Sequence, residues 1–543
     1  MSTRWEASDK DIKMVFNFTE QREAVNITTN FGGAGSVQIE NNTLASGTKS
    51  GDYQLRNATE VREFEILLNG KDKTREKLLV RPLECILGQC PIEAVEDINL
   101  PDKASPWSNK DSWGGVLPVD GDEVEIKNNM WIELDLKETP KLKKLTINGR
   151  LTVKSDKDNL PDIKLQSKLI WVRSGELLVG TAEAPFEQNF VVELQGETED
   201  ETLTLDGLTK AGNKVIVSNN KIEMFGKKRT NISRMIEAAN AGDEKIKVAA
   251  DVDWVAGDRI FLATSTIQHD HGEFHTIKAI DKGEITLETA LKFYHYGTKE
   301  STATSYNGVD IRNEVLLLTR NVKIMGEKKD GWAGHILVSD LIEGENTRYG
   351  TMTLESVQVE NCSQKDLSRG AIRFEGATHT GEGKKSKITN CAVHEGDDWG
   401  LFIDRSNNIE ISDTAFISWR AVGVSIDTSE NLIFNRNFIG HTRERVWTAL
   451  GMAIDKAACV ALGTYTNKAM PSKNLEMKDN IAAGCVYAGF MAPSLEACGG
   501  TFDKYKGNVA HSSTRYGVYA YTNPLATKSA ECTEWGHFSA YKT

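Results

Sequence analysis

Three histidines lie within seven positions of the segment "HDHGEFH", and their spacing fits a metal site. On a β-strand, His269 and His271 point to the same face, and Glu273 continues that face because side chains alternate along a strand. Two imidazoles and a carboxylate suit zinc or another borderline divalent cation. His295 and His335 lie in later segments that would stack nearby in a repetitive β structure, so they complete the candidate ligand set. The competing interpretation is a polar turn whose histidines form only local hydrogen bonds.

The segment "HEGDDWG" offers a second kind of chemistry, because it places His394 beside Asp397 and Asp398. Polysaccharide hydrolases need two carboxyl groups, one as the acid and one as the base or nucleophile. However, a repeat of 23 residues in this part of the chain aligns Arg420 with Asp397, and Arg443 one step further. A column of opposite charges along a turn is the simpler interpretation, so the three residues are only weak catalytic candidates.

The composition excludes several classes of partner. The chain has 543 residues and a formal net charge of −13 at pH 7, and no basic face stands out that could bind a nucleic-acid backbone. It contains no apolar run of about 18 residues that would form a transmembrane helix. Its start also lacks the apolar core of a signal peptide. We therefore expect no nucleic-acid partner, and membrane contact only through parts of a full-length protein that this chain does not include.

Two features nevertheless favour an extracellular or cell-surface location. Acceptor motifs for N-linked glycans occur six times, with four in the first sixty residues, at Asn17, Asn26, Asn41, Asn57, Asn231 and Asn361. The cysteines are even in number and locally grouped, which suits disulfide bonds; they are Cys85, Cys90, Cys362, Cys391, Cys459, Cys485, Cys498 and Cys532. The alternative for the cysteines is a set of buried free thiols.

Short alternating or apolar runs separated by Gly, Asn and Asp predict an all-β chain. Segments such as "VEIKNNMWIELDL" and "LKKLTINGRLTV" have the length and the turn residues of strands. One stretch, "TNISRMIEAANAGDEKIK", is predicted as a short helix with Asn231 or Ser233 as its N-cap.

An internal repeat indicates the architecture. The segment from Ile388 matches the segment from Ile411 at an offset of 23 residues, which aligns Val393 with Phe416, Gly400 with Gly423 and Ile403 with Ile426. The pattern returns later, where a glycine lies nine residues after each of Cys391, Thr414, Asn480 and Asn508. A β repeat of this length is one coil of a solenoid, whose coils stack at about 4.8 Å. We predict a right-handed parallel β-helix with polar turn residues aligned from coil to coil. No polar cap is visible after the last coil, so we expect the natural protein to continue beyond Thr543.

Residues 106–228 resemble the G8 domain. The resemblance rests on Trp107 and Trp113 in "PWSNKDSWGG", on "LPVDGDEVEI" and "SGELLVGTAEAPF", and on the glycines Gly115, Gly121, Gly149, Gly175, Gly180, Gly196 and Gly226. The following segments, including "DWVAGDRIFLATSTIQHDHGEFHTIKAI" and "WAGHILVSD", are similar to the region after the G8 domain in the fibrocystin family. The G8-containing cell-surface hyaluronidases share this region in looser form.

The resemblance implies a large extracellular or ciliary-surface protein in which a G8 domain leads into parallel β-helix repeats. We expect a β-rich segment of unknown type over residues 1–100, the G8 domain over 101–228, and β-helix repeats over 229–543. In the hyaluronan-degrading branch, the resemblance implies an arginine directly after the "VVELQG" strand. This chain has Glu197 there, and a carboxylate repels an acidic sugar instead of pairing with it.

The favoured function is therefore a receptor-like adhesion surface that binds glycans or extracellular proteins, without enzymatic activity and with no cofactor beyond the candidate divalent metal. The alternatives are a polysaccharide-degrading enzyme, either hyaluronidase-like or a β-helix glycoside hydrolase, and a structural spacer at the cell surface. Aromatic residues such as Trp419, Trp447 and Tyr465 would stack on sugars if exposed. Cys362 and Cys391 each follow an asparagine, and equivalent turn positions in successive coils would place them within disulfide range.

Overall fold

The computed structural model describes residues 99–543 apart from 206–208, 301, 328–330, 344–345, 366–368, 380–384, 421, 428, 444–457, 463–471, 493–503 and 521–537. In the first 98 residues it describes the backbone of eight strands: β1 (Ser2–Ala7), β2 (Ile12–Phe18), β3 (Ala24–Thr29), β4 (Ser36–Ile39), β5 (Asn42–Ser46), β6 (Gly51–Arg56), β7 (Arg62–Asn69) and β8 (Thr74–Pro82).

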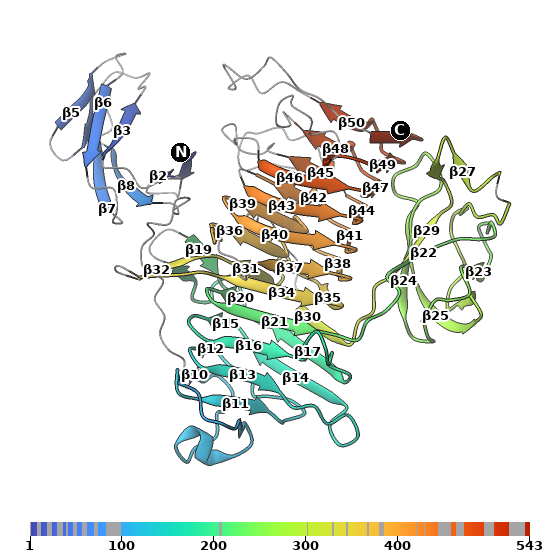
Figure 1. Cartoon of the computed structure of the whole chain (residues 1–543), viewed down its shortest axis with the longest axis horizontal. Coiled ribbons are helices and arrows are strands. Elements are labelled where there is room, and N and C mark those ends of the chain that lie inside the picture. Colours follow the sequence, from blue (N-terminus) through green and yellow to red (C-terminus); the bar gives the residue numbers. More distant parts are fainter. Residues whose placement is uncertain are drawn as a thin grey trace.

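Three long parallel sheets run side by side along the molecule (Figure 1). Sheet 1 consists of β10 (Glu123–Ile126), β12 (Lys144–Ile147), β15 (Leu169–Val172), β20 (Val215–Ser218), β31 (His335–Val338), β36 (Ile372–Glu375), β39 (Leu401–Asp404), β42 (Val422–Ile426), β45 (Ala458–Leu462), β48 (Ala488–Ala492) and β50 (Tyr516–Ala520). Sheet 2 consists of β9 (Ser105–Pro106), β11 (Trp131–Leu134), β13 (Arg150–Val153), β16 (Glu176–Val179), β21 (Lys221–Phe225), β34 (Thr351–Glu355), β37 (Ser386–Thr389), β40 (Asn407–Ser412), β43 (Glu430–Asn435) and β46 (Lys473–Lys478). Sheet 3 consists of β14 (Asp162–Ser167), β17 (Asn189–Leu194), β30 (Val322–Gly326), β35 (Val357–Glu360), β38 (Ala392–His394), β41 (Ala415–Ile417), β44 (Phe438–Gly440), β47 (Ile481–Ala483), β49 (Asn508–His511) and β51 (Phe538–Tyr541).

A complete coil contributes one strand to each sheet, as β15, β16 and β17 do, so the chain forms the predicted parallel β-helix. The predicted 23-residue register is confirmed, since Ile388 pairs with Ile411, Val393 with Phe416 and Ile403 with Ile426. Alternate apolar residues of the strands point inward, such as Leu145 and Ile147 of β12, and these side chains stack into a single core that extends from Trp107 to Ala510. Stacking is needed because a single coil cannot bury its own inward face.

A column of polar side chains closes the corner at the start of five strands of sheet 3, namely β38, β41, β44, β47 and β49. Each side chain accepts a hydrogen bond from a backbone amide of the preceding coil. The donor amide and the accepting side chain are, in order, Val357 and Cys391, Cys391 and Thr414, Thr414 and Asn437, Asn437 and Asn480, and Asn480 and Asn508. The predicted alignment of polar turn residues is therefore confirmed, and the column satisfies buried amides that the sheets leave unpaired.

The corners before this column turn sharply through left-handed backbone. Asn390, Asp413, Arg436 and Asp479 occupy the same position in successive coils, and their φ values lie between 51° and 55°. Their side chains project outward from the corner between sheets 2 and 3. This row of residues is the coil-corner column.

The G8 region is part of the solenoid rather than a separate unit before it. Strands β9 to β17 and β20 and β21 occupy the first positions of the same three sheets. In contrast, residues 229–320 leave the solenoid between β21 and β30 and form a separate sheet. The boundary predicted at residue 229 therefore marks the start of an insertion and not the start of the β-helix.

This inserted domain (residues 229–320) is a six-stranded antiparallel sheet in the order β22-β29-β24-β25-β26-β23, and it lies beside sheet 3 (Figure 1). Its strands are β22 (Ile232–Arg234), β23 (Lys245–Lys247), β24 (Arg259–Leu262), β25 (Glu273–Asp281), β26 (Glu284–Leu287) and β29 (Glu314–Leu317). Three small hairpins complete the described elements: β18 (Leu203–Leu205) with β19 (Thr209–Gly212), β27 (Ser305–Tyr306) with β28 (Val309–Asp310), and β32 (Leu341–Glu343) with β33 (Asn346–Arg348).

The inserted sheet has two apolar faces because its side chains alternate. Val315 and Leu317 pack in the core of the inserted domain. Leu316 and Leu318 pack instead against sheet 3, where they meet Ala392, Ala415, Ile417, Phe438 and Ala483. The inserted domain is therefore fixed to the solenoid by a continuous apolar contact.

The helix predicted from residue 230 onward is wrong. Residues 232–234 and 245–247 form β22 and β23, because their backbones pair with β29 and β26, and Ile246 of β23 and Met235 directly after β22 pack in the inserted core. The described residues contain one short 3₁₀ helix, Lys110–Trp113, and no helix long and apolar enough to cross a membrane.

The cysteines divide into two described pairs. Cys459 and Cys485 form a disulfide with their Cα atoms 5.5 Å apart, whereas Cys362 and Cys391 are buried free thiols. The predicted bridge between the latter is wrong because of register: Glu360 pairs with His394, which places Cys391 beside Val357 and Cys362 at the other end of the strand. Cys85, Cys90, Cys498 and Cys532 lie outside the described residues.

Replacing Asn480 by alanine should destabilise the solenoid. The change leaves the buried Asn437 amide without an acceptor and removes the bonds from Asn480 Nδ2 to Phe434 O and Asn508 Oδ1. We expect a loss of roughly 3 kcal/mol in the free energy of unfolding, measured by urea denaturation. Asn189→Ala is the control, because Asn189 is exposed and its side chain donates a hydrogen bond to Asp162. This variant should lose less than about 0.5 kcal/mol in the free energy of unfolding. Equal losses for both variants would contradict a structural role for the polar column.

Candidate functional site

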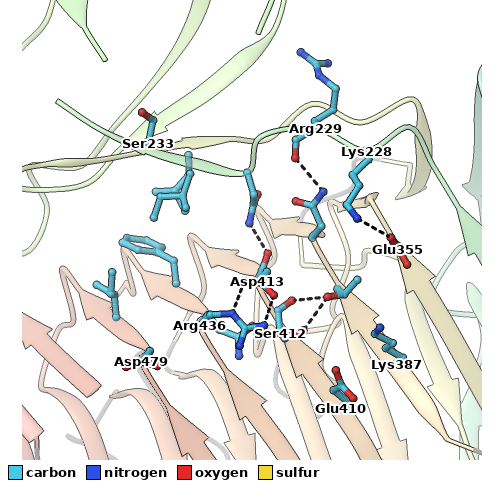
Figure 2. Close-up of a pocket in the computed structure, with 18 of the residues that line it drawn as sticks. Lys228, Arg229, Ser233, Glu355, Lys387, Glu410, Ser412, Asp413, Arg436 and Asp479 are labelled. Carbon is cyan, nitrogen blue, oxygen red and sulfur yellow. Dashed lines mark hydrogen bonds and ion pairs between the residues drawn. The ribbon is translucent and has the colours of Figure 1, made fainter. Parts of the chain in front are cut away.

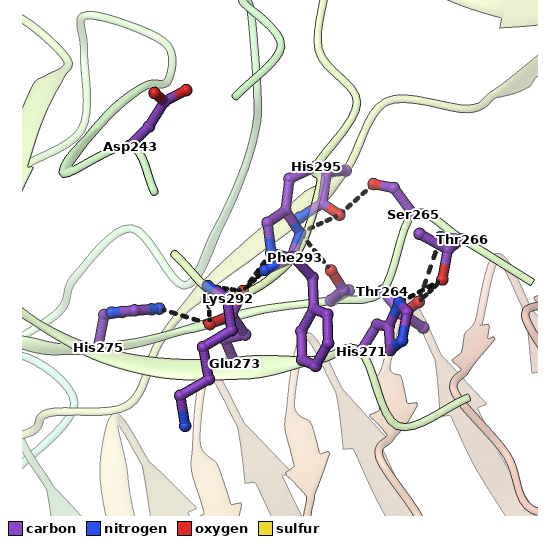
Figure 3. A network of polar contacts seen from close by, with 12 residues as sticks. Asp243, Thr264, Ser265, Thr266, His271, Glu273, His275, Lys292, Phe293 and His295 are labelled. Carbon is purple, nitrogen blue, oxygen red and sulfur yellow. Dashed lines mark hydrogen bonds and ion pairs between the residues drawn. The ribbon is translucent and has the colours of Figure 1, made fainter. Parts of the chain in front are cut away.

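The histidine segment forms a buried anchor around Glu273 (Figure 3). The Glu273 carboxylate accepts hydrogen bonds from the backbone amides of Lys292 at 2.8 Å and Phe293 at 2.9 Å, and it lies 3.0 Å from His295 Nε2. His275 Nε2 lies 3.4 Å from the same carboxylate. Burial alone would raise the pKa of Glu273, but these donors hold that pKa well below its usual range. Glu273 therefore fastens residues 292–295 to β25.

Of the other predicted metal ligands, His295 contacts Glu273, but His269, His271 and His335 do not complete a ligand set with this pair. Both ring nitrogens of His295 face oxygen acceptors, since Nδ1 lies 3.0 Å from Ala263 O. The His271 ring stacks on Phe293 at 3.9 Å between centroids. His269 is only half-buried.

His335 lies in β31, where it pairs with Val215 of the solenoid and not with the inserted domain. The ligand set predicted from His269, His271, Glu273, His295 and His335 is therefore not assembled. The prediction assumed one strand through the first three residues, but β25 begins only at Glu273 and His269 lies in a turn, so strand alternation does not apply to His269 and His271. The insertion separates His335 from all of them.

Within the described part of the chain, one other group of side chains has ligand atoms close enough for a metal: Glu360, His394 and Glu395. Arg259 pairs with both carboxylates, and Lys323 Nζ lies 3.3 Å from Glu360. Burial raises the pKa of Glu395, but hydrogen bonds from His394 and Arg259 lower it to about 2. The two cations already balance the carboxylates, so this group is an ion-pair network that joins the inserted domain to sheet 3.

The catalytic candidates are likewise kept apart. His394 is directed at Gln358, with 3.1 Å between their Nε2 atoms, and at Glu395 instead of either aspartate. Asp397 accepts a hydrogen bond from the Gly331 amide at 3.1 Å, and Asp398 is buried. The arrangement lacks a carboxylate pair around an open site.

The predicted column of opposite charges stays a prediction, because the contacts between its members are made by the backbone. The Arg420 amide donates to Asp398 O, and Arg420 pairs with Arg443 of the next coil. The prediction that Trp419 stacks on sugars is wrong, because Trp419 is fully buried in the core. Trp447 and Tyr465 lie outside the described residues.

Glu197 lies in an exposed turn after β17, and its backbone amide donates a hydrogen bond to the Asp200 carboxylate.

An open groove of about 710 Å³ lies where the inserted domain meets the coil corners (Figure 2). Its floor is apolar and consists of Ile232, Leu316, Phe438 and Ile481. Its rim is charged and consists of Lys228, Glu355, Lys387, Glu410, Asp413, Arg436 and Asp479. These residues come from the inserted domain and from successive coils of the solenoid, so no local sequence motif marks the groove.

Two pairs of opposite charges lie on the rim, and the remaining rim residues carry both signs. Arg436 holds both carboxylate oxygens of Asp413, at 2.6 and 2.8 Å, and this hydrogen bonding raises the pKa of Arg436. Lys228 lies 3.9 Å from Glu355. Figure 2 shows both pairs beside the opening between the inserted strand and the coil corners. The groove is therefore charged but nearly balanced.

The coil-corner column holds the entry to the inserted domain in place. Asn390 Nδ2 donates to Arg229 O at 3.0 Å, and Asn231 Nδ2 donates to Asp413 O at 2.5 Å. Arg320 donates to Asn231 Oδ1 at 2.6 Å, so the Asn231 amide is engaged at both ends and is poorly placed to carry the predicted glycan. Asn361 is half-buried at a coil corner. No side chain is described for Asn17, Asn26, Asn41 and Asn57.

Replacing Glu273 by glutamine should destabilise the inserted domain, because one amide group cannot accept from all the donors around it. We expect a loss of about 2 kcal/mol at neutral pH, measured by the unfolding free energy. The folded pKa of Glu273 lies below its unfolded value, so its stabilisation is present above about pH 5 and declines as the pH falls. The difference between wild type and variant should therefore shrink towards acidic pH.

Glu288→Gln is the matched control, because Glu288 is exposed and directly follows β26 of the same inserted domain. A difference between wild type and Glu273→Gln that does not change with pH would contradict the charged anchor.

Comparison with known proteins places these features in a family context. Residues 112–235 match the G8 domain. Dog fibrocystin is 25% identical over 508 residues, which cover 89% of this chain and 11% of that protein. Human fibrocystin-L is 31% identical over 239 residues, 42% of this chain and 5% of that protein. The chain thus spans about a tenth of the length of the fibrocystin it matches.

A G8 domain-containing protein of Dictyostelium discoideum is 27% identical over 394 residues, covering 65% of this chain and 32% of that protein. Among solved structures, tailspike protein 2 of bacteriophage CBA120 aligns with a TM-score of 0.23 and 10% identity, over 78% of this chain and 41% of that one. The architecture is assigned from the parallel strand pairing itself. The chain carries a G8 domain at residues 112–235 within a parallel β-helix, and it resembles the fibrocystins over most of its length.

Proposed function

We propose that this chain is a non-catalytic, ligand-binding part of a cell-surface protein and that the groove beside the inserted domain is its binding site. The observation that carries the proposal is the groove itself, which is concave, has an apolar floor and is bordered by converging polar groups. Sites of this form, at the junction of two structural units, are the usual location of ligand binding.

The state of the carboxylates supports binding over hydrolysis. A glycoside hydrolase needs one carboxyl group in an apolar environment to act as an acid and a second, ionised one nearby. In the groove, Asp413 is held at both oxygens by Arg436, and Glu410 is paired with Lys385. Asp413 and Glu410 are thus each already paired with a cation, which suits recognition of a polar ligand.

Three observations support a location outside the cell. The disulfide between Cys459 and Cys485 requires an oxidising environment to persist. The first sixty residues contain four glycan acceptor motifs. The similarity to the fibrocystins agrees with both.

Filling the groove should abolish binding of its ligand. We expect Ile232→Trp to place an indole over the apolar floor and to weaken binding at least roughly tenfold for any ligand that enters the groove. The measurement is binding of the chain to an immobilised panel of hyaluronan, heparan sulfate, pectin and extracellular-matrix proteins, with polymer length followed by size-exclusion chromatography in parallel.

Ile267→Trp is the matched control, because Ile267 is an exposed isoleucine of the same inserted domain that does not line the groove. If both variants bind the members of the panel as well as the wild type does, the binding site lies outside the groove. Shortening of any polymer by the wild-type chain would contradict a non-catalytic role.

A further inference from the structure

Strand β22 of the inserted domain has one free edge. It is the end strand of its sheet, and among the strands that the structure describes it pairs with β29 alone. The Leu317 amide donates to Asn231 O at 2.9 Å, and the Met235 amide donates to Asn313 O at 3.0 Å. Since alternate residues of a strand direct their backbone groups to opposite sides, the amides and carbonyls of Ile232 and Arg234 face away from β29.

The free edge of β22 borders the groove. Ile232 and Arg234 both line it, and the backbone groups of these two residues have no hydrogen-bond partner within the described segments. The Ile232 side chain is 38% exposed and lies on the same face of the sheet as Leu316, its cross-strand partner. The groove therefore combines unpaired backbone donors and acceptors with an apolar floor.

The edge is held in strand conformation before any ligand arrives. Residues before β22 are tied to the coil-corner column by Asn390 and Asp413, and Arg234 Nη1 bonds Glu314 of β29 at 2.5 Å. A partner that pairs with this edge would not have to order it first, which reduces the entropic cost of binding.

We propose that the groove binds an extended peptide segment, which adds to the free edge of β22 as a further strand. The inference rests on the proposed function, because it names the class of ligand for the same groove. In this mode the main chain of the peptide bonds Ile232 and Arg234, and alternate side chains of the peptide enter the apolar floor. Exposed strand edges are the natural templates for such pairing.

The charges and the aromatic content of the groove favour a peptide over a glycan. A polyanionic glycan needs a surplus of cations, but Arg436 is already paired with Asp413 and the remaining rim carries both signs. A neutral glycan uses exposed aromatic platforms. Phe438, the aromatic residue of the groove, is 3% exposed. A peptide with an apolar side chain towards the floor and charged side chains towards the rim fits both features.

Selection of short random peptides displayed against the whole chain supplies the probe. In the peptides that bind, N-methylation of every second backbone amide should raise Kd roughly tenfold, because only those amides face β22. Methylation of the intervening amides is the matched control and should change Kd by less than about twofold. An equal effect at every position, or no effect at any, would overturn strand addition.

Ile232→Pro tests the same contact from the side of the protein. Proline removes the Ile232 amide, which points to the groove and makes no bond with β29, and edge strands tolerate such a change. Binding of the selected peptides should fall roughly tenfold, whereas Ile232→Val, which keeps the amide and the apolar side chain, should bind as the wild type does. Unchanged binding by folded Ile232→Pro would overturn the proposal. The N-methylated peptides test the same backbone contact on the wild-type protein, so the result does not depend on whether Ile232→Pro folds.

A glycan array probed with the same chain separates this inference from the proposed function. A glycan whose binding is lost in Ile232→Trp but kept in Ile232→Pro, with no peptide that depends on β22, would overturn the peptide assignment and leave the groove as the binding site. Peptides and glycans that bind Ile232→Trp as well as wild type would overturn both.

Discussion

The structure depends on one constraint: every buried backbone amide of a coil must find an acceptor, including those at the corners where the sheets end. The sheets pair their own strands, but a corner interrupts that pairing in each coil. The polar column from Cys391 to Asn508 restores an acceptor at the same place in successive coils. A fixed register follows, and with it the alignment of inward apolar residues and of outward corner residues.

The fixed register also determines where a second unit can dock. Small outward residues of sheet 3, such as Ala392 and Ala415, align into a flat apolar face, and Leu316 of the inserted strand β29 packs on it. Because β29 alternates between two cores, docking the inserted domain holds its sheet at a set distance from the corners. The groove is the space left between that sheet and the coil-corner column, so it is preformed by the same contacts that stabilise the fold.

The repeat could be predicted from the sequence because it is local: Ile388 and Ile411 lie one coil apart, and the offset keeps the same residue types in place. Pairings that cross the insertion could not be predicted. His335 was grouped with Glu273, yet it belongs to a coil that begins after the inserted domain ends. The expected Cys362–Cys391 bridge failed for a related reason, since both follow an asparagine but stand at opposite ends of paired strands. The groove was missed entirely, because its two walls come from segments nearly 200 positions apart, as Asn231 and Asp413 illustrate.

The segment richest in reactive side chains is therefore not where a ligand is expected. Glu273 and His295 satisfy one another and the surrounding backbone, and a buried group whose partners are all present gains nothing from a ligand that would displace them. The edge of β22, in contrast, has backbone groups without hydrogen-bond partners among the described residues. Ile232 presents backbone groups and an apolar side chain that the described part of the fold leaves open, in the groove between the inserted domain and the coil corners. Binding is favoured where the fold leaves hydrogen-bonding capacity unused beside apolar surface, and this molecule does so at the joint between its two units and not at its histidine cluster.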